Sequence, residues 1–267
     1  MSEVEIQQQT EEWLKFRSTR IGGSDAPIIM GDSPFMTPHQ LWKQKRGLAP
    51  AFEGNFATRR GNRFEPVMRS LYELETGLEL PPVVLVHKRY NFLIASMDGY
   101  SESAKIGFET KVAGKEVYQY ACEDKVHPKY LAQVQHQLEV TGAKENHFVV
   151  GLAGKDAFTG TDKIVDVKIV KVVRDAKYIE ETLLPKEIEF YGHMIDGTEP
   201  ELTKDDVIEV DQPDMVVLAN ENQRERLIAE LFEKYNHTNF RIAGYKLMRD
   251  VNGVWRWTKP KGLKNAA

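Results

Sequence analysis

The stretch Gly107-Phe108-Glu109-Thr110-Lys111 lies in a short apolar run, residues 106–112, that predicts a buried β-strand. Because side chains alternate between the two faces of a strand, Glu109 and Lys111 point to one face, and Phe108 and Thr110 point to the other. A carboxylate and an ammonium group side by side at the edge of a buried strand can hold a divalent cation and orient a water molecule. The triplet alone also fits a solvated ion pair, so its meaning depends on the partners that the rest of the chain supplies.

The composition is that of an ordinary globular chain without a marked overall charge. Its 267 residues are 41% hydrophobic and 28% charged with a formal net charge of -4, so a surface that binds nucleic acid would have to be locally basic. Cys122 is the only cysteine, which excludes an internal disulfide, a tetrahedral thiolate zinc site and an iron–sulfur cluster. A single cysteine fits a reducing compartment, residues 1–9 contain no signal-peptide core, and no apolar run approaches the ~18 residues of a membrane span. We therefore expect a cytoplasmic protein with no membrane segment.

Helices are expected in the first part of the chain from capping residues and from a period of 3.6. Their expected ranges are residues 3–18, residues 25–30 with Ser24 as the N-cap, residues 38–46, and a helix that starts near Asn62 or kinks at Pro66 and ends near Gly77. The apolar stripe expected to bury the last of these helices comprises Phe64, Val67, Met68, Leu71 and Leu74.

The middle of the chain alternates strands and helices. Strands are expected over residues 83–86, 92–95, 106–112, 147–152 and 163–173, and helices over residues 128–142 and 175–195. This order predicts an α/β fold in which helices flank one central mixed sheet.

The character of the chain changes after residue 196. Gly197-Thr198-Glu199-Pro200 is a linker, so we expect one domain over residues 1–200 and a small extension over residues 201–267. In the extension we expect a helix over residues 213–235 and a β-hairpin of strands 240–248 and 254–258, which turns at Asn252-Gly253.

Several chain segments can bring ligands to the Glu109 and Lys111 side chains. Asp98 ends the strand before them, Glu65 flanks an earlier helix, and Gln133 lies on a later one. Carboxylates that converge at a sheet edge suit Mg²⁺ or Mn²⁺. Phosphodiester hydrolysis needs such a cation, and a neighbouring lysine can position or deprotonate the attacking water or stabilise the transition state.

A second site is indicated by the turn Gly22-Gly23-Ser24-Asp25. Its free N–H groups precede a short helix, and Arg17 and Arg20 come just before it. A helix N-terminus next to arginines favours an anion, although a plain capped turn has the same residues. His127, His136 and His193 show no metal-binding spacing, and Trp255 and Trp257 alternate on a hairpin, so we expect all five to be structural or surface residues.

Five stretches, in this order, resemble the lambda-exonuclease/YqaJ-like viral recombinase family of the PD-(D/E)xK nuclease superfamily. They are residues 13–25, Gly61-Asn62-Arg63-Phe64-Glu65, Met97-Asp98-Gly99, Phe108-Glu109-Thr110-Lys111 and Tyr130-Leu131-Ala132-Gln133-Val134-Gln135. The resemblance covers roughly residues 12–195. Met97 stands where the family often has Pro or Ala, and Thr110 replaces a more common apolar residue.

The resemblance implies a restriction-endonuclease-like core and a role for each matched residue. The implied metal ligands are Asp98, Glu109 and the backbone carbonyl of Thr110, with Glu65 on a second metal or its water. The implied catalytic lysine is Lys111, and Gln133 supports this lysine or the nucleophilic water. The implied 5′-phosphate and DNA-binding residues are Arg17, Ser24 and Arg20.

The implied activity is a 5′→3′ exonuclease on linear double-stranded DNA, dependent on Mg²⁺ with Mn²⁺ as a possible substitute. It would start at a 5′-phosphorylated end and leave a 3′ single strand for recombination by a single-strand annealing protein, in the cytosol of a phage-infected or bacterial cell. Family members can form a ring around DNA, so a ring-like homotrimer is expected, with residues 201–267 available for assembly or for contacts with DNA or a partner. The alternatives are an endonuclease on the same fold and a catalytically silent DNA-end-binding protein. Because Asp98, Glu109 and Lys111 are all present, the silent protein is disfavoured.

Overall fold

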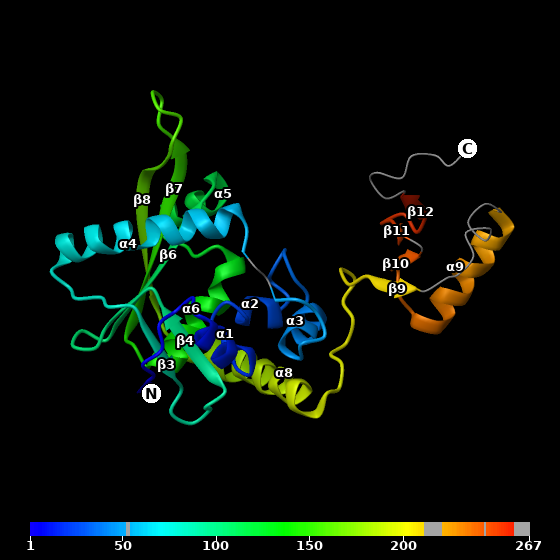
Figure 1. Cartoon of the computed structure of the whole chain (residues 1–267), viewed down its shortest axis with the longest axis horizontal. Helices are drawn as coiled ribbons and strands as arrows, with labels where there is room; N and C mark the ends of the chain where they lie inside the picture. Colours follow the sequence, from blue (N-terminus) through cyan, green and yellow to red (C-terminus); the bar gives the residue numbers. More distant parts are fainter. Residues whose placement is uncertain (52–53, 211–220, 243, 259–267) are drawn as a thin grey trace. The chain divides into compact units, whose positions relative to one another are not determined.

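The chain divides into two compact units, Met1–Pro200 and Glu201–Ala267, in the computed structural model shown in Figure 1. The structure describes residues 1–51, 54–210, 221–242 and 244–258. The first unit carries every residue expected to take part in chemistry. The functions expected for the two units stay predictions.

The first sheet of this unit has the strand order β1-β3-β4-β2. Strand β3 (Val83–Val86) pairs antiparallel with β1 (Ser2–Glu3) and with β4 (Leu93–Met97). Strand β2 (Ile21–Gly22) runs parallel to β4. The apolar runs predict β3 and β4, whereas β1 and β2 are two-residue strands without a pattern of their own.

The second sheet has the order β5-β6-β7-β8, with β5 at Gly99–Ser101, β6 at Ile106–Ala113, β7 at Glu145–Lys155 and β8 at Asp162–Val173. Strand β6 is antiparallel to β5 and parallel to β7, and β8 is antiparallel to β7. The expected α/β fold with mixed pairing flanked by helices is confirmed. It consists of two four-stranded sheets in place of one, and a single residue, Asp98, separates β4 of the first sheet from β5 of the second.

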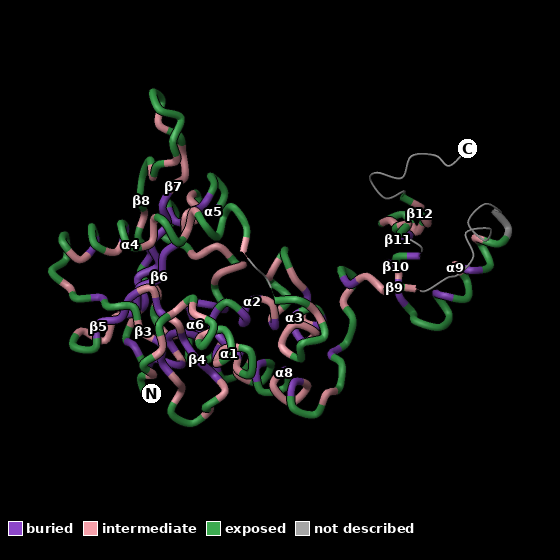
Figure 2. The backbone as a smooth tube through the Cα atoms, viewed as in Figure 1, coloured by how far each residue is buried: buried purple, intermediate pink, exposed green. Residues whose placement is uncertain are grey.

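Helices cover both faces of β6. Phe108 packs with Tyr72 of α4 (Phe56–Thr76), whereas Glu109, on the opposite face, meets α6 (Pro128–Thr141). Figure 2 shows the burial concentrated along β4, β6, β7 and α6. Fully burying a large apolar side chain such as Phe108 or Phe148, both 0% exposed, contributes about 1.5–3 kcal/mol. The strand that carries Glu109 and Lys111 is therefore fixed by the core on both sides.

The N-terminal helix is shorter than predicted. Helix α1 spans Glu11–Ser18 and begins after Thr10, whose hydroxyl accepts a hydrogen bond from the N–H of Trp13 at 3.2 Å. The prediction of a helix from residue 3 was wrong because Ser2–Glu3 pairs with β3 as strand β1. The Ser24 cap was also wrong: Asp25 occupies the N-cap position of α2 (Ala26–Ile29), and Ser24 contacts an arginine.

Helix α3 (Pro38–Lys45) agrees with the prediction, and its capping box joins Thr37 to Gln40. Helix α4 starts at Phe56, with a capping box of its own, so Pro66 lies in the helix interior. The predicted burial of its stripe was largely wrong. The face that meets the sheet is centred on Met68 and Tyr72, and Val67, Leu71 and Leu74 are 52%, 60% and 84% exposed.

The remaining helices of this unit are α5 (Lys115–Cys122) and a segment of successive helical pieces at the C-terminal end of the unit. The helix expected over residues 175–195 is α7 (Ala176–Tyr178), a π-helical turn (Ile179–Leu183) and α8 (Leu184–Asp196) in succession. Pro185 lies in the first turn of α8, where its missing N–H disturbs the regular hydrogen-bond ladder and favours the wider turn.

The second unit contains a four-stranded sheet of order β12-β11-β10-β9 and one described helix, α9 (Glu221–Tyr235). The strands are β9 (Ile208–Val210), β10 (Asn239–Ile242), β11 (Tyr245–Arg249) and β12 (Trp255–Thr258). The predicted strand 240–248 folds back on itself as β10 and β11, and the hairpin expected at Asn252-Gly253 joins β11 to β12. Trp255 and Trp257 pack against the core of this unit, as expected. The part of the predicted helix at residues 213–220 lies outside the described residues.

No described helix combines the length and the apolar character needed to cross a lipid bilayer.

Candidate active site

Asp98 lies at the junction of the two sheets, where β4 ends and β5 begins. Its Oδ2 accepts hydrogen bonds from the backbone N–H of Thr110 at 2.8 Å and from the Thr110 hydroxyl at 2.9 Å. Burial and the nearby carboxylates of Glu109 and Glu65 raise the pKa of Asp98 to about 8, against the opposing effect of Lys111. The site therefore concentrates negative charge that a cation would stabilise.

The backbone of Thr110 faces the same junction. Its N–H points to Asp98, and in a β-strand the N–H and C=O of one residue point to the same edge. Pairing between β5 and β6 stops at Gly99 and Phe108, so β5 does not reach this position. We therefore expect the Thr110 carbonyl to point to the open edge beside Asp98, as its implied role as a metal ligand requires.

Glu109 is buried, with 2% of its surface exposed, and three side chains donate to it. Lys111 and the Nε2 of Gln133 donate to Oε1, the latter at 2.7 Å, and the Nε2 of Gln137 donates to Oε2 at 2.6 Å. Gln137 in turn accepts a hydrogen bond from Asn146 on β7 at 2.9 Å. The sequence placed Gln133 at this site but missed Gln137, whose only signal was its position four residues further along the same helix.

Lys111 is held between carboxylates. Burial would lower its pKa, but Glu109 and Asp98 together raise it above the ordinary lysine value. The ammonium group also lies 5.4 Å from the centroid of the Tyr130 ring. Lys111 is therefore a cation at the edge of the site, with 22% of its side chain exposed.

Glu65 approaches the same group from α4. Its Oε1 accepts a hydrogen bond from Nη1 of Arg69 at 3.2 Å, and Arg69 also donates to the backbone carbonyl of Asp98. Burial and the charge of Glu109 raise the pKa of Glu65, against the effects of Arg69 and Lys111. Glu65 thus faces the other carboxylates, and Arg69, which the sequence analysis did not select, ties α4 to the Asp98 turn.

The donor set fits a hard cation, although the carboxylates are not drawn together around one point. Among the described residues, no group of three or more His, Cys, Asp or Glu side chains stands at ligand geometry. A carboxylate offers about four acceptor positions, and Glu109 uses three of them. The described residues make no hydrogen bond to Oδ1 of Asp98. Oxygen donors of this kind suit Mg²⁺ or Mn²⁺.

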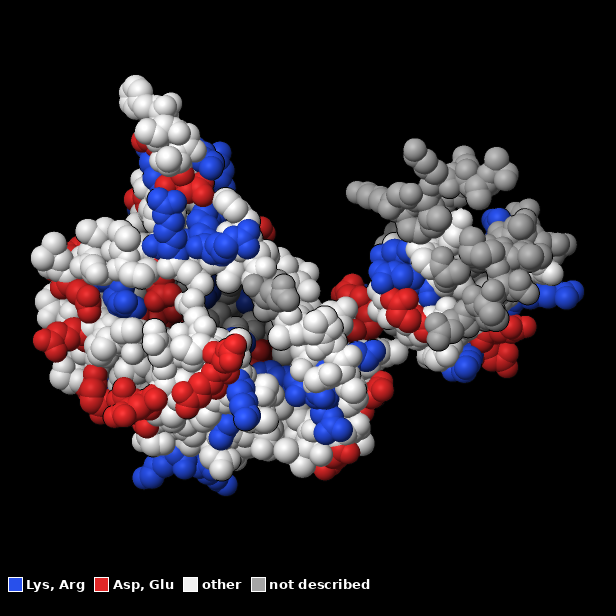
Figure 3. Space-filling view, in the orientation of Figure 1, with Lys and Arg blue, Asp and Glu red and all other residues white. Residues whose placement is uncertain are grey.

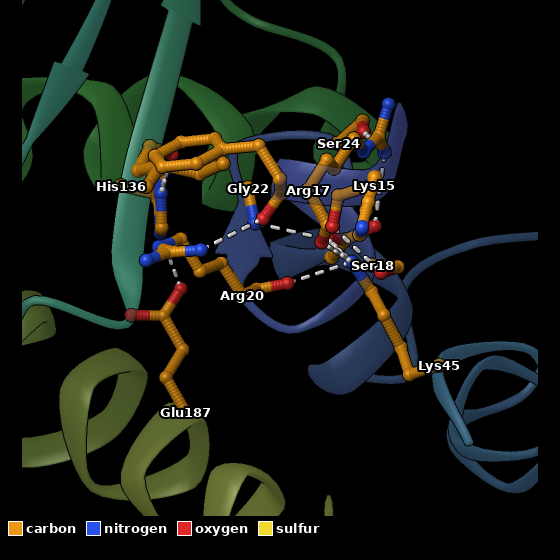
Figure 4. A network of polar contacts seen from close by, with 12 residues as sticks. Lys15, Arg17, Ser18, Arg20, Gly22, Ser24, Lys45, His136 and Glu187 are labelled. Carbon is orange, nitrogen blue, oxygen red and sulfur yellow. Dashed lines mark hydrogen bonds and ion pairs between the residues drawn. The ribbon is translucent and has the colours of Figure 1, made fainter. Parts of the chain in front are cut away.

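Two of the residues expected to bind a phosphate, Arg17 and Ser24, contact each other (Figure 4). Nη2 of Arg17 donates to the Ser24 hydroxyl at 2.6 Å and lies 3.1 Å from Oδ1 of Asp25. A methyl group on Gly23 would lie 3.4 Å from Cγ of Gln137 and 3.5 Å from Cγ of Gln133. Gly23 of the turn therefore packs against the two glutamines that bind Glu109.

Arg20 makes its contacts with Phe16, and Lys45, which the sequence did not indicate as a site residue, lies beside Asp25. Nη1 of Arg20 donates to the carbonyl of Phe16 at 3.0 Å, and its guanidinium carbon is 3.9 Å from the centroid of the Phe16 ring. Its DNA-binding role stays a prediction. Lys45 of α3 lies 2.7 Å from Oδ2 of Asp25. It is 20 residues away in sequence, so only the tertiary fold shows the contact.

His136 is structural, as expected. It is 1% exposed, its Nδ1 lies 2.6 Å from Oε1 of Glu187, and its Nε2 lies 2.9 Å from the carbonyl of Ile94. Burial would lower its pKa, but Glu187 and the Ile94 carbonyl raise it. The contacts connect α6, α8 and β4 near the Gly22-Gly23-Ser24-Asp25 turn (Figure 4).

A basic cluster lies near the first turns of α4. It comprises Arg60, Arg63 and Lys155. The pKa of Asp162 is lowered, first by its hydrogen bond to Lys155 and also by Arg60 and Arg63, which places these charges together. Nε of Arg60 is buried and has no hydrogen-bond partner among the described residues. Figure 3 shows Lys and Arg side chains gathered over α4 and the base of the β7–β8 hairpin, beside a hollow in this face.

Comparison with known proteins identifies sequence relatives over this part of the chain. Residues 12–144 match the sequence model of the YqaJ-like viral recombinase domain. The uncharacterized protein YqaJ of Bacillus subtilis strain 168 is 30% identical over 192 residues, which cover 70% of this chain and 57% of that protein. The chain therefore spans a little over half the length of this relative.

Comparison with solved structures confirms the fold. An alkaline exonuclease, LHK-Exo from Laribacter hongkongensis, is similar with a TM-score of 0.56 and 23% identity, over 70% of this chain and 94% of that one. LHK-Exo in complex with dAMP gives a TM-score of 0.57 and 22% identity at the same coverage. Identities of this size show a shared architecture, and the chemistry has to be argued from the residues of this chain.

Proposed function

Residues 12–144 belong to the YqaJ-like viral recombinase family, and from this we propose that the chain is a metal-dependent exonuclease that hydrolyses linear double-stranded DNA. The observation that carries the proposal is that Asp98, Glu109 and Lys111 lie together at the edge of β6 beyond the point where its pairing with β5 ends. LHK-Exo, which has a similar fold, is described as an alkaline exonuclease and has been solved with the nucleotide dAMP. Both facts favour nucleic acid as the substrate.

Asp98, Glu109, the Thr110 carbonyl and Glu65 are the groups that would hold the cation, with Mg²⁺ as the first candidate and Mn²⁺ as a substitute. When bound, the cation would offset the negative charge that develops on the phosphate and lower the pKa of a bound water. The raised pKa values of Asp98 and Glu65 support this assignment, because burial and the neighbouring carboxylates outweigh the opposing effects of Lys111 and Arg69.

The remaining residues position a metal ligand or stabilise the transition state. Lys111, held by the Glu109 carboxylate, can donate to a phosphate oxygen and stabilise the charge of the transition state. Gln133 and Gln137 fix the Glu109 carboxylate, because each amide donates to a different oxygen. Orientation of this kind counts in catalysis, since misplaced groups lose much of their effect.

The direction of digestion follows from where the end of the DNA stops. Arg17 contacts Ser24, and the neighbouring Gly23 packs against the two glutamines that bind Glu109. We assign Arg17 and Ser24 to a terminal 5′-phosphate, which gives 5′→3′ digestion and a 3′ single strand for recombination. The basic cluster Arg60, Arg63 and Lys155 would hold the phosphates of the duplex further from the end. A single-strand annealing protein is the proposed partner for the product strand.

Assembly is the proposed role of the second unit. A ring-like homotrimer would keep the enzyme on its substrate although the chain carries a net charge of -4, because only the channel has to be positive. Residues 201–267 are proposed to serve this assembly, or to contact DNA or the annealing partner.

One substrate panel tests the proposed function. Linear duplexes with 5′-phosphate or 5′-hydroxyl ends and a covalently closed circle are incubated with Mg²⁺, and the products are mapped by strand-specific labels. We expect digestion of the linear duplexes, fastest from the 5′-phosphate, and none of the circle. Equal cutting of the circle would establish an endonuclease, and binding of ends without any cleavage would establish a silent end-binding protein.

A further inference from the structure

A buried carboxylate lies behind Arg17 and Ser24, and two cations bind it. Asp25 is 2% exposed. Its Oδ1 lies 3.1 Å from Nη2 of Arg17 and its Oδ2 lies 2.7 Å from Nζ of Lys45, while the N–H of Gly22 donates to Oδ2 at 2.9 Å. Figure 4 shows how Arg17, Gly22 and Lys45 converge from separate parts of the chain.

Lys45 is enclosed by the protein. Only 6% of its side chain is exposed, and besides Asp25 its ammonium group donates to the backbone carbonyls of Arg17 at 3.1 Å and Arg20 at 2.7 Å. An ammonium group has three donors, and all three are used. Lys45 therefore cannot also bind a ligand, and it acts on ligand binding by Arg17 through its charge and through Asp25.

Arg17 keeps donors for a ligand. Its contacts with Ser24 and Asp25 both use Nη2, and its Nε and Nη1 donate no hydrogen bond to any described residue. A guanidinium group has five N–H donors, so several remain. Its side chain is 29% exposed, which leaves a path from solvent.

The charges around Arg17 do not cancel. Burial would raise the pKa of Asp25, but Lys45 and Arg17 lower it far below the ordinary value, so the carboxylate is ionised. Without Lys45, the Asp25 carboxylate would neutralise Arg17 and weaken the attraction of Arg17 for an anion. Burial lowers the pKa of Lys45, but its contacts with Asp25 and with two backbone carbonyls favour the ammonium form. Lys45 thus supplies the second cation, so two positive charges and one negative charge leave one positive charge.

We propose that Lys45 sets the net charge at Arg17 and Ser24. Because Lys45 neutralises Asp25, the Asp25 carboxylate can hold Arg17 in place while Arg17 still presents one uncompensated positive charge to a terminal 5′-phosphate. Lys45 and Asp25 are positioning residues, since neither touches the phosphate. The inference rests on the proposed function, because it takes Arg17 and Ser24 as the phosphate receptor. An arginine fixed before the ligand arrives loses less conformational freedom on binding, which favours affinity.

Two variants separate the charge of Lys45 from its packing. Lys45→Met removes the ammonium group and leaves Asp25 to neutralise Arg17. The double variant Asp25→Asn/Lys45→Met removes both buried charges, and the asparagine oxygen can still accept from Arg17, so the single positive charge returns. Lys43→Met, two residues away on α3, is the matched control, since no described contact joins Lys43 to Asp25.

The measurement is the affinity of the full chain for a short labelled duplex with a 5′-phosphate and for the same duplex with a 5′-hydroxyl, by fluorescence anisotropy in a chelator that prevents cleavage. The preference is the ratio of the two dissociation constants. In Lys45→Met we expect this preference to fall about tenfold or more, as for the loss of a charge-assisted contact. The double variant should recover most of the preference, and Lys43→Met should keep it.

Four results would overturn the inference. An unchanged preference in Lys45→Met would show that its charge is irrelevant, and equal losses in the single and double variants would show a structural role only. If Lys45→Met does not fold by thermal unfolding, the double variant decides alone, and loss of preference in the folded double variant refutes the charge account. A wild-type protein without any preference would remove the phosphate pocket, whereas digestion of linear DNA in the same preparation would leave the nuclease proposal standing.

Discussion

Replacing Gln137 by methionine tests whether the second amide at Glu109 belongs to the site. Gln137 is 1% exposed, donates to Oε2 of Glu109 at 2.6 Å and accepts from Nδ2 of Asn146 at 2.9 Å. Methionine has a similar length and volume but neither polar atom, so Gln137→Met removes both hydrogen bonds without opening a large cavity.

The size of the effect follows from the two contacts. A hydrogen bond to a charged group contributes about 1.5–3 kcal/mol, and an orphaned buried donor costs about 1–3 kcal/mol. We therefore expect Gln137→Met to reduce the free energy of unfolding by about 2.5–6 kcal/mol, which corresponds to a melting temperature lower by at least about 5 °C in a unit of this size. Loss of a residue that orients a metal ligand costs about 10–100-fold in metal affinity or activity, so we expect a loss of that order in the rate of digestion.

The matched control is Gln135→Met on the same helix. Gln135 is also buried, but its Nε2 donates to the carbonyl of Val173 at 3.0 Å and its Oε1 accepts from the N–H of Asp175 at 2.9 Å. Both contacts are neutral, so this variant should lose about 1–3 kcal/mol of stability. The assays are thermal unfolding with and without Mg²⁺ and the rate of digestion of a linear duplex. Only Gln137→Met should lose activity beyond what its stability explains. If the two variants digest DNA equally fast well below their melting temperatures, the role assigned to Gln137 is refuted.

Three further predictions concern other parts of the first unit. The raised pKa of His136 means that its pair with Glu187 contributes fully below about pH 6.5 and is lost as pH rises through the folded pKa, so urea unfolding should show stability falling above pH 6.5, and Glu187→Gln should flatten that fall. Arg60→Ala/Arg63→Ala should weaken binding to every duplex sequence and reduce the slope of log K against log salt by up to about 2, while an unchanged slope would place the DNA elsewhere. Mg²⁺ should raise the melting temperature of the wild-type protein. Above about pH 8, where Asp98 is ionised, Asp98→Asn relieves the repulsion between the carboxylates and should melt higher in a chelator and respond less to Mg²⁺; an equal response in both proteins would remove Asp98 from the cation site.

The sequence predicted the strands that carry chemistry because their signals are local. An apolar run predicts β6, and its period of 2 places Glu109 and Lys111 on one face, where the structure has them in contact. The capping box at Thr37 and the left-handed glycines at positions 77 and 142 likewise mark helix ends by local chemistry.

What the sequence could not predict depends on contacts between distant segments. The apolar side chains of α4 lie on two adjacent faces, and only packing against Phe108 and Val149 selects the face of Met68 and Tyr72. Residues 3–10 have helical composition, but pairing with β3 takes Ser2–Glu3 into a strand.

The missed site residues share the same cause. Gln137 acts on Glu109 only because α6 lies across β6, and Lys45 reaches Asp25 only because α3 packs near the Gly-Gly turn. Arg69 contacts the Asp98 turn from 29 residues away. None of these contacts has a local pattern, so the sequence alone left each residue with a plain surface or helix role.

Lys111→Ala tests the central claim most directly. Wild-type protein, Lys111→Ala and the surface control Lys105→Ala are compared for Mg²⁺-dependent release of nucleotides from a 5′-phosphorylated linear duplex, together with their affinity for the same duplex. In the part of the chain that the structure describes, Lys105 forms an ion pair with the exposed Glu102 alone, so its loss should change neither quantity. We predict that Lys111→Ala binds the duplex but does not release nucleotides. Undiminished release by a folded Lys111→Ala protein would contradict the assignment of the active site to Asp98, Glu109 and Lys111.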